Sequence, residues 1–101
     1  MIIFPAMDLW NGDIVKLDCG THVDGYVTDN ATTVDLRDGE NSLLLAASRM
    51  ALENAIAVMG PGPSLTEVGR QVEDTIQSLG FKPVRNLCGH GVARFTIHCA
   101  P

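Results

Sequence analysis

The stretch from Gly12 to Val34 constrains the fold most strongly, because it holds two runs rich in β-branched residues around a polar turn. The first run is residues 13–19 and the second is residues 26–34. Residues 20–25 lie between them and supply two glycines and an aspartate, which favour tight turns. Two such runs joined by turn residues predict an antiparallel β-hairpin.

Each predicted strand carries an acidic residue, Asp18 on the first and Asp29 on the second. If the turn centres on Val23 and Asp24, the two aspartates face each other with Cβ atoms about 5 Å apart. Like charges about 4 Å apart repel by about 4 kcal/mol at an effective dielectric constant near 20. A shared proton or a bound cation would relieve this repulsion. The alternative is a different strand register, in which solvent hydrates both carboxylates.

Composition excludes several classes of protein. The chain has 101 residues, 46% of them hydrophobic and 19% charged, which is typical of one modest globular domain. A net charge of −5 argues against binding to nucleic acid or to an anionic membrane. The sequence contains no apolar run of the roughly 20 residues that span a bilayer, and its start does not resemble a signal peptide. Three cysteines without framework spacing indicate the reducing cytoplasm.

Two helices are predicted after the hairpin. The first covers about residues 40–59 and is rich in alanine, with Asn41 or Asp38 as the expected cap of its start. The second begins with a capping box at residues 64–67 and ends before Gly80. We expect the apolar stripes of both helices to be core faces; they comprise Leu45, Leu52, Ile56 and Met59 on the first, and Leu65, Val68, Val72, Ile76 and Leu79 on the second.

Residues 84–88 and 93–99 are strand-like and are separated by Gly89, His90 and Gly91. A further short strand is expected at residues 2–4. The order hairpin, helix, helix, strand, strand predicts an α+β domain in which both helices pack on one face of an antiparallel sheet.

His90 and His98 lie eight residues apart, and His90 is flanked by glycines that let the chain turn tightly. Imidazole together with carboxylates is a ligand set suited to Mn, Fe, Co or Zn. The simpler interpretation is that each histidine is exposed or hydrogen-bonded within the fold. A zinc knuckle that includes Cys88 and Cys99 is a further alternative, although the paired spacing of such sites is absent. Arg94 is most simply interpreted as a solvated surface residue.

Several short motifs occur in a fixed order. The hairpin follows the pattern GD-x-x-K-x-D-x-G-x-x-x-DG-x-x-x-D, and the later segments read GFKP at residues 80–83, NLCGH at 86–90 and IHCA at 97–100. Together they resemble the type II methionine aminopeptidases, which have the pita-bread fold, over about residues 12–100. Type I enzymes share the acid pair but usually have GHGIG and a seven-residue step between the histidines. The eight-residue step and Asn86-Leu87 favour type II.

The resemblance implies a metalloaminopeptidase that removes the N-terminal methionine from nascent polypeptides in the cytoplasm, without nucleic-acid or membrane partners. Asp18, Asp29 and His90 would be ligands of two divalent metal ions, which could be Co, Mn, Fe or Zn. Two such ions some 3.5–4 Å apart would supply a hydroxide nucleophile and polarise the scissile carbonyl. His98 would be catalytic, contacting the scissile peptide rather than a metal.

Residues 1–101 do not supply everything that the resemblance requires. The family uses two further glutamate ligands downstream and a histidine upstream, and neither occurs in this sequence. The resemblance therefore implies a single, incomplete catalytic domain over residues 1–101 that is inactive alone. Two alternatives remain open: a non-catalytic binding or regulatory relative of the same fold, and an Xaa-Pro aminopeptidase.

Overall fold

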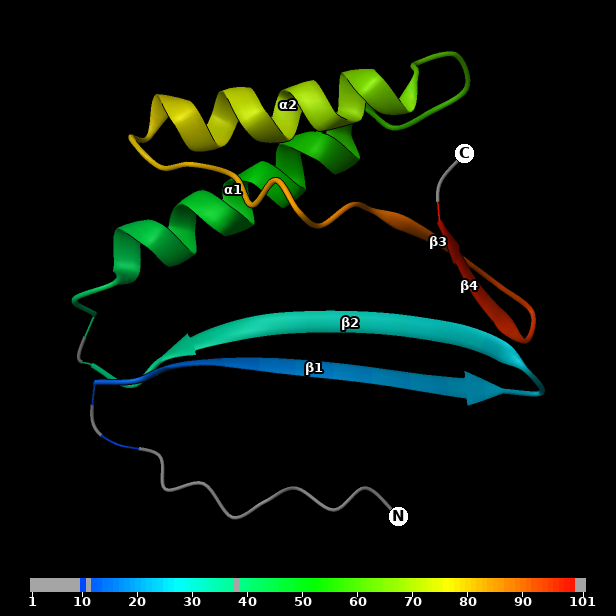
Figure 1. The fold of residues 1–101 in the computed structure, drawn as a ribbon, viewed down its shortest axis with the longest axis horizontal. Helices are drawn as coiled ribbons and strands as arrows, with labels where there is room; N and C mark the ends of the chain where they lie inside the picture. The colour runs from blue at the N-terminus through cyan, green and yellow to red at the C-terminus, as the bar shows by residue number, and fades with distance from the viewer. Residues whose placement is uncertain (1–9, 11, 38, 100–101) are drawn as a thin grey trace.

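The computed structural model describes residues 10, 12–37 and 39–99 (Figure 1). The strand expected at residues 2–4 and the alternative capping residue Asp38 lie outside the described residues. Along the chain the elements are β1 (Ile14–Val23), β2 (Tyr26–Asp35), α1 (Ser42–Val58), α2 (Leu65–Ser78), β3 (His90–Ala93) and β4 (Thr96–Cys99). This is the predicted order and confirms an α+β fold. Neither helix of the described part combines the length and apolarity needed to cross a membrane.

The β1–β2 hairpin turns at Asp24 and Gly25, whose φ angles of 50° and 84° are those of a type I′ turn. The turn lies one residue later than predicted, because Asp-Gly is the preferred pair for this turn and residues 20–23 extend β1. Asp18 therefore pairs with Ala31 and Asp29 with Gly20. The expectation that the two aspartates face each other was wrong. They lie diagonally on the same face of the hairpin, where repulsion is weaker.

The start of α1 is organised by Asp35 at the end of β2. Its carboxylate accepts hydrogen bonds from the backbone N–H groups of Arg37 and Asn41, both at 2.8 Å. The hydrogen bond from Arg37, with those from Asn41, holds the pKa of Asp35 below its usual value. Asn41 is the N-cap residue as predicted, but its side chain makes no capping bond within the helix.

The helix pair packs through small side chains. Within the described residues, the buried apolar side chains are Ala47, Ala51 and Ala55, which are 0–3% exposed and follow one four-residue row of α1. The predicted core stripe of α1 was wrong for Leu52, Ile56 and Met59, which are more than half exposed, whereas Leu45 is half-buried. Alanine side chains let two helices approach closely, whereas Leu52 stays largely exposed at the edge of a groove that it shares with Val72 and Ile76 of α2. The middle of the α2 stripe is half-buried, whereas Leu65 is exposed.

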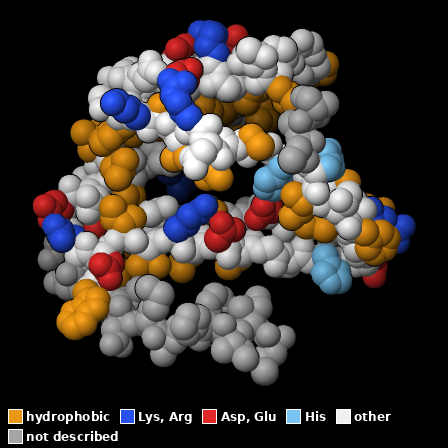
Figure 2. All heavy atoms as spheres, in the orientation of Figure 1, with side chains coloured by type: hydrophobic (Ala, Val, Ile, Leu, Met, Phe, Trp, Pro, Cys, Tyr) orange, Lys and Arg blue, Asp and Glu red, His pale blue; other side chains and the backbone are white. Residues whose placement is uncertain are grey.

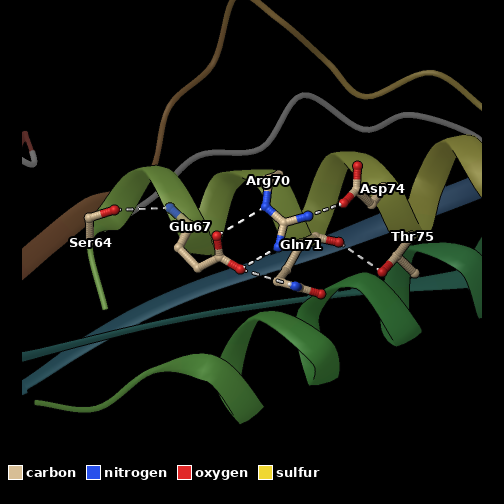
Figure 3. A network of polar contacts seen from close by, with 6 residues as sticks. All are labelled: Ser64, Glu67, Arg70, Gln71, Asp74 and Thr75. Atoms are coloured by element: carbon tan, nitrogen blue, oxygen red, sulfur yellow. Dashed lines mark hydrogen bonds and ion pairs between the residues drawn. The ribbon is translucent and has the colours of Figure 1, made fainter. Parts of the chain in front are cut away.

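Both ends of α2 are capped at the predicted residues, although only the Ser64 half of the predicted capping box forms, because the Glu67 carboxylate binds Arg70 and Gln71. Ser64 Oγ accepts a hydrogen bond from the N–H of Glu67 at 3.3 Å (Figure 3). At the other end Gly80 has a φ of +81°, and its N–H donates to the carbonyl of Gln77. The N–H of Phe81 donates to the carbonyl of Ile76, which completes a Schellman motif.

A network of charged side chains covers the outer face of α2 (Figure 3). Arg70 binds the carboxylates of Glu67 and Asp74, and the Gln71 side chain donates to Glu67 at 3.2 Å. The hydrogen bond from Arg70, followed by that from Gln71, lowers the pKa of Glu67 from 4.5 to about 2. A folded-state pKa below the unfolded value stabilises the fold above pH 4.5, and this stabilisation is lost as the pH falls towards 2.

We expect Glu67→Gln to lower the melting temperature at pH 5 by more than at pH 2. At pH 5 the Glu67 carboxylate of the folded parent chain is ionised and bound to Arg70. As the pH falls to 2 this carboxylate becomes protonated, as it already is in the unfolded chain, so its contribution to stability is lost. Circular-dichroism melts of parent and variant at several pH values between 2 and 6 measure the difference. A difference that stays constant across that range would contradict the assigned network.

The second hairpin begins later than predicted. Residues 84–88 are not a strand; Arg85 instead pairs with Glu73 of α2 at 2.7 Å, which draws this segment towards the helix. His90 and Gly91 belong to β3 rather than separating two strands. The strands form two ladders, linked in the described part by an isolated bridge between Tyr26 and Arg94. Both helices lie on one side of the β1–β2 hairpin (Figure 1).

Candidate metal centre

Asp29 and His90 meet where β3 begins beside β2. The distance from His90 Nε2 to Asp29 Oδ2 is 3.1 Å, and the side chains are 39% and 30% exposed. Asp29 of β2 pairs with Gly20 of β1, and the two residues lie on the same face of the hairpin. Because glycine has no side chain, Gly20 does not cover the Asp29 carboxylate. Figure 2 shows histidine and acidic side chains meeting beside the hollow between the strands and the helices. Of the sequence-predicted ligands, the structure thus brings these two into direct contact.

Both ring nitrogens of His90 face oxygen atoms. Nε2 faces the Asp29 carboxylate, and Nδ1 lies 3.4 Å from the carbonyl oxygen of Gly91. A neutral imidazole has one N–H, so it satisfies only one of these contacts. A proton or a metal ion between Nε2 and Oδ2 satisfies both.

The separation of these atoms suits a metal ion. Nitrogen and oxygen ligands lie about 2.1 Å from Zn²⁺ or a similar ion, so two neighbouring ligands are about 3.0–3.4 Å apart. The observed 3.1 Å falls in this range. A metal-binding histidine usually donates its second N–H to a carbonyl or carboxylate, as Nδ1 can to Gly91. The residues present therefore fit a divalent metal ion held by Asp29 and His90.

Asp18 does not join this pair. Its Oδ2 lies 3.2 Å from Nζ of Lys16, and its side chain is 57% exposed. The described residues contain no group of three or more histidine, cysteine, aspartate or glutamate side chains placed to hold a metal ion. Asp18 and Asp29 share a face, but the diagonal spacing of such residues is about 7–8 Å. Lys16 provides the positive charge beside Asp18.

His98 lies on β4 directly opposite Gly91 of β3. Its ring occupies the space that a side chain at position 91 would fill, so Gly91 is required for this arrangement. His90 and His98 both line a groove of about 800 Å³ between α2 and the segment that follows it. The walls of this groove are mostly apolar and include Leu65, Val68, Val72 and Leu87. Both histidines therefore border this groove, although the register places their side chains on opposite faces of the β3–β4 hairpin.

Sequence reasoning missed the residues that join the two hairpins. Arg94 was interpreted as solvated, yet its Nε donates to the carbonyl of Asp24 at 3.2 Å and its guanidinium lies over the ring of Tyr26. Phe95 packs against Gly25. The Asp-Gly turn was visible in the sequence, but nothing there indicated that a second turn would cover it.

The sequence model of metallopeptidase family M24 matches residues 4–101. The chain belongs to this family. It is similar to curated methionine aminopeptidases, including that of Archaeoglobus fulgidus, with 49% identity over 90 residues that cover 89% of this chain and 30% of the relative. The enzyme of Methanothermobacter thermautotrophicus is 46% identical over 87% of this chain and 30% of its own length. The protein of Methanothermus fervidus is 40% identical over 86% of this chain and 53% of its own.

Membership of family M24 confirms the predicted metallopeptidase class and the pita-bread fold. The named relatives confirm the resemblance to methionine aminopeptidases. The chain spans about 30% of the length of the first two of these relatives. A metallopeptidase requires a divalent metal ion, and Asp29 and His90 are the residues of the described part whose contact suits one.

Proposed function

We propose that this chain forms part of the metal centre of a methionine aminopeptidase, which removes the N-terminal methionine from nascent polypeptides in the cytoplasm. The contact between Asp29 and His90 carries the proposal, because it joins the two ligand types at metal-binding separation. The 40–49% identity to curated methionine aminopeptidases supports the substrate class. The free thiols of Cys19 and Cys88 are consistent with a reducing compartment.

In this proposal Asp29 and His90 hold one divalent ion in common, and Asp18 is a third ligand that must leave Lys16 to reach the centre. The complete centre holds two ions, and Co, Mn, Fe and Zn all suit these donors. When bound, the metal would activate water and polarise the scissile carbonyl. With its proton on Nδ1, His90 would donate to the carbonyl of Gly91, 3.4 Å away, and Nε2 would bind the ion.

His98 is proposed to donate a hydrogen bond to the scissile peptide. It lies on the strand next to His90 and opens onto the same groove, so a substrate beside the metal would pass within reach of its ring. A donor aimed at the developing charge stabilises the transition state more than the bound substrate. This role requires the ring to stay over Gly91.

We expect Gly91→Ala in the complete enzyme to lower kcat at least about tenfold, because the added methyl group displaces the His98 ring; removing such a donor altogether costs 10²–10³. Gly89→Ala is the matched control, since a methyl group at position 89 meets no atom within 4 Å. Steady-state kinetics on a peptide with N-terminal methionine compare the two variants. Equal kcat values would contradict the proposed role of His98.

The decisive experiment uses the complete protein and measures release of free methionine from peptides that begin with methionine. We expect activity to disappear after chelation and to return on addition of Co²⁺ or Mn²⁺. The 101-residue chain alone is expected to be inactive. Metal uptake without methionine release would favour a non-catalytic relative, and preference for Xaa-Pro peptides would favour the prolyl-specific enzyme. Either result would overturn the proposal.

A further inference from the structure

The turns of the two hairpins are locked together. The N–H of Phe95 donates to the carbonyl of Gly25 at 2.7 Å, and Arg94 Nε donates to the carbonyl of Asp24 at 3.2 Å. The guanidinium of Arg94 lies between the rings of Tyr26 and Phe95, 5.3 Å and 4.9 Å from their centroids. We call this contact, between residues 24–26 and residues 94–95, the turn clamp. Figure 1 shows the two turns side by side at one end of the hairpin.

The turn clamp depends on close approach at Gly25. A Cβ atom at this position would overlap the ring of Phe95, so only glycine admits the contact. Phe95 itself has a φ of 63°, a conformation that bulky side chains rarely adopt. Its side chain is 74% exposed, so burial does not hold it there. Phe95 is the second residue of the two-residue turn between Ala93 and Thr96, where a positive φ is common, and the hydrogen bond to Gly25 and the ring contact stabilise it in this turn.

The turn clamp also sets the register of the proposed ligands. The bridge between Tyr26 and Arg94 is antiparallel. Asp29 lies three residues beyond Tyr26, about 10 Å along β2, and His90 lies four residues before Arg94, about 13 Å along β3. Counted from the bridge, His90 therefore lies one residue, about 3 Å, beyond the level of Asp29, and the two side chains meet across this offset at 3.1 Å. The turn clamp therefore fixes how far along β2 the second hairpin lies, and a shift of this hairpin by one residue would move His90 by about 3.3 Å relative to Asp29.

Other restraints on the second hairpin are weak. Its strands have four residues each, and an isolated two-stranded hairpin is marginally stable in water. In the described part of the chain, the Tyr26–Arg94 bridge is the backbone pairing that ties this hairpin to β2. We propose that Arg94 and Phe95 are positioning residues, which hold His90 against Asp29 through the turn clamp. The proposal rests on the proposed function for the role of this pair as metal ligands.

The test measures the position of His90 before any metal is added. In the 101-residue chain, a nuclear Overhauser effect between the His90 ring and the Asp29 β-protons reports their contact. We expect Phe95→Ala and Gly25→Ala to abolish this signal, and Phe95→Tyr, which keeps the ring, to retain it. Gly39→Ala is the matched control, because Gly39 has a φ of +85°, close to the +84° of Gly25, but open space around it. Unchanged α1–α2 signals show that the helices remain folded.

A second measurement adds Co²⁺ alone and compares affinities by calorimetry. We expect Phe95→Ala to weaken binding about tenfold and Phe95→Tyr to leave it unchanged. A His90–Asp29 signal that persists in Phe95→Ala would overturn the positioning role. Loss of that signal with unaltered Co²⁺ affinity would support the positioning role and overturn the metal role of the pair, and with it the proposed function.

Discussion

Asp29→Asn and His90→Ala are each expected to reduce the affinity of the complete enzyme for Co²⁺ by more than about 100-fold, and its turnover at limiting metal similarly. Even the outer partners of metal ligands change affinity by 10–100-fold, and these side chains are proposed to contact the ion itself. Asparagine keeps the shape of Asp29 but removes the charge that a divalent ion requires. His90→Ala also removes the ring that lies 3.1 Å from the Asp29 carboxylate.

Calorimetric titration with Co²⁺ and the methionine-release assay measure both effects. Asp24→Asn is the matched control, since it makes the same chemical change in the same hairpin. Asp24 lies in the turn with a φ of 50°, and asparagine favours this conformation, so the fold should be retained. Metal affinities that fall equally in Asp24→Asn and Asp29→Asn would show that hairpin charge, rather than a ligand, determines binding.

The hairpin was predictable because its information is local. Alternating β-branched residues and an Asp-Gly pair specify two strands and a turn, and the structure contains them. The register was missed by a single residue at the turn, since residues 20–23 can serve either as turn or as strand. Because of this small error, Asp29 was predicted as the cross-strand partner of Asp18, whereas the structure has Ala31 there. The prediction that both aspartates lie on one face was still correct. Moving the turn by one residue changes each cross-strand partner by two positions, which keeps the same face of the hairpin.

The helix caps and most of the α2 face were predicted, whereas the packing face of α1 was not. Periodicity identified large apolar residues on α1, but the structure buries the row of alanines beside them. Helix contact depends on how closely two backbones approach, and this is a property of the pair rather than of either sequence. In the same way, residues 84–88 have strand-forming side chains but no strand beside them.

The candidate metal centre was accessible to sequence reasoning only in part. Carboxylates and histidines indicated metal chemistry, but the resemblance, not their spacing, paired Asp29 with His90. The turn clamp was missed because Arg94 and Asp24 are 70 residues apart. An arginine followed by a phenylalanine has no local pattern that predicts contact with a distant glycine. Such contacts arise from the tertiary fold and are visible only in the structure.

Ala47→Leu is expected to destabilise the fold by about 1–3 kcal/mol, because a fully buried alanine leaves no room for three more carbon atoms. In a domain of this size each kcal/mol lowers the melting temperature by about 4–8 °C. Ala47 lies on the α1 row that faces inward, where the added atoms must push neighbouring elements apart. Leucine is nearly as good a helix former as alanine, so helix propensity contributes little to the loss.

The adjacent Ala46→Leu is the control, since Ala46 is exposed on the same helix and tolerates the same change without crowding. Thermal melts followed by helical circular dichroism should show a large decrease for Ala47→Leu and almost none for Ala46→Leu. If both variants melted with the parent, the alanine row could not be the contact that holds α1 in place. The larger exposed residues of α1, such as Leu52 and Ile56, would then have to supply the packing, contrary to their exposure in the structure.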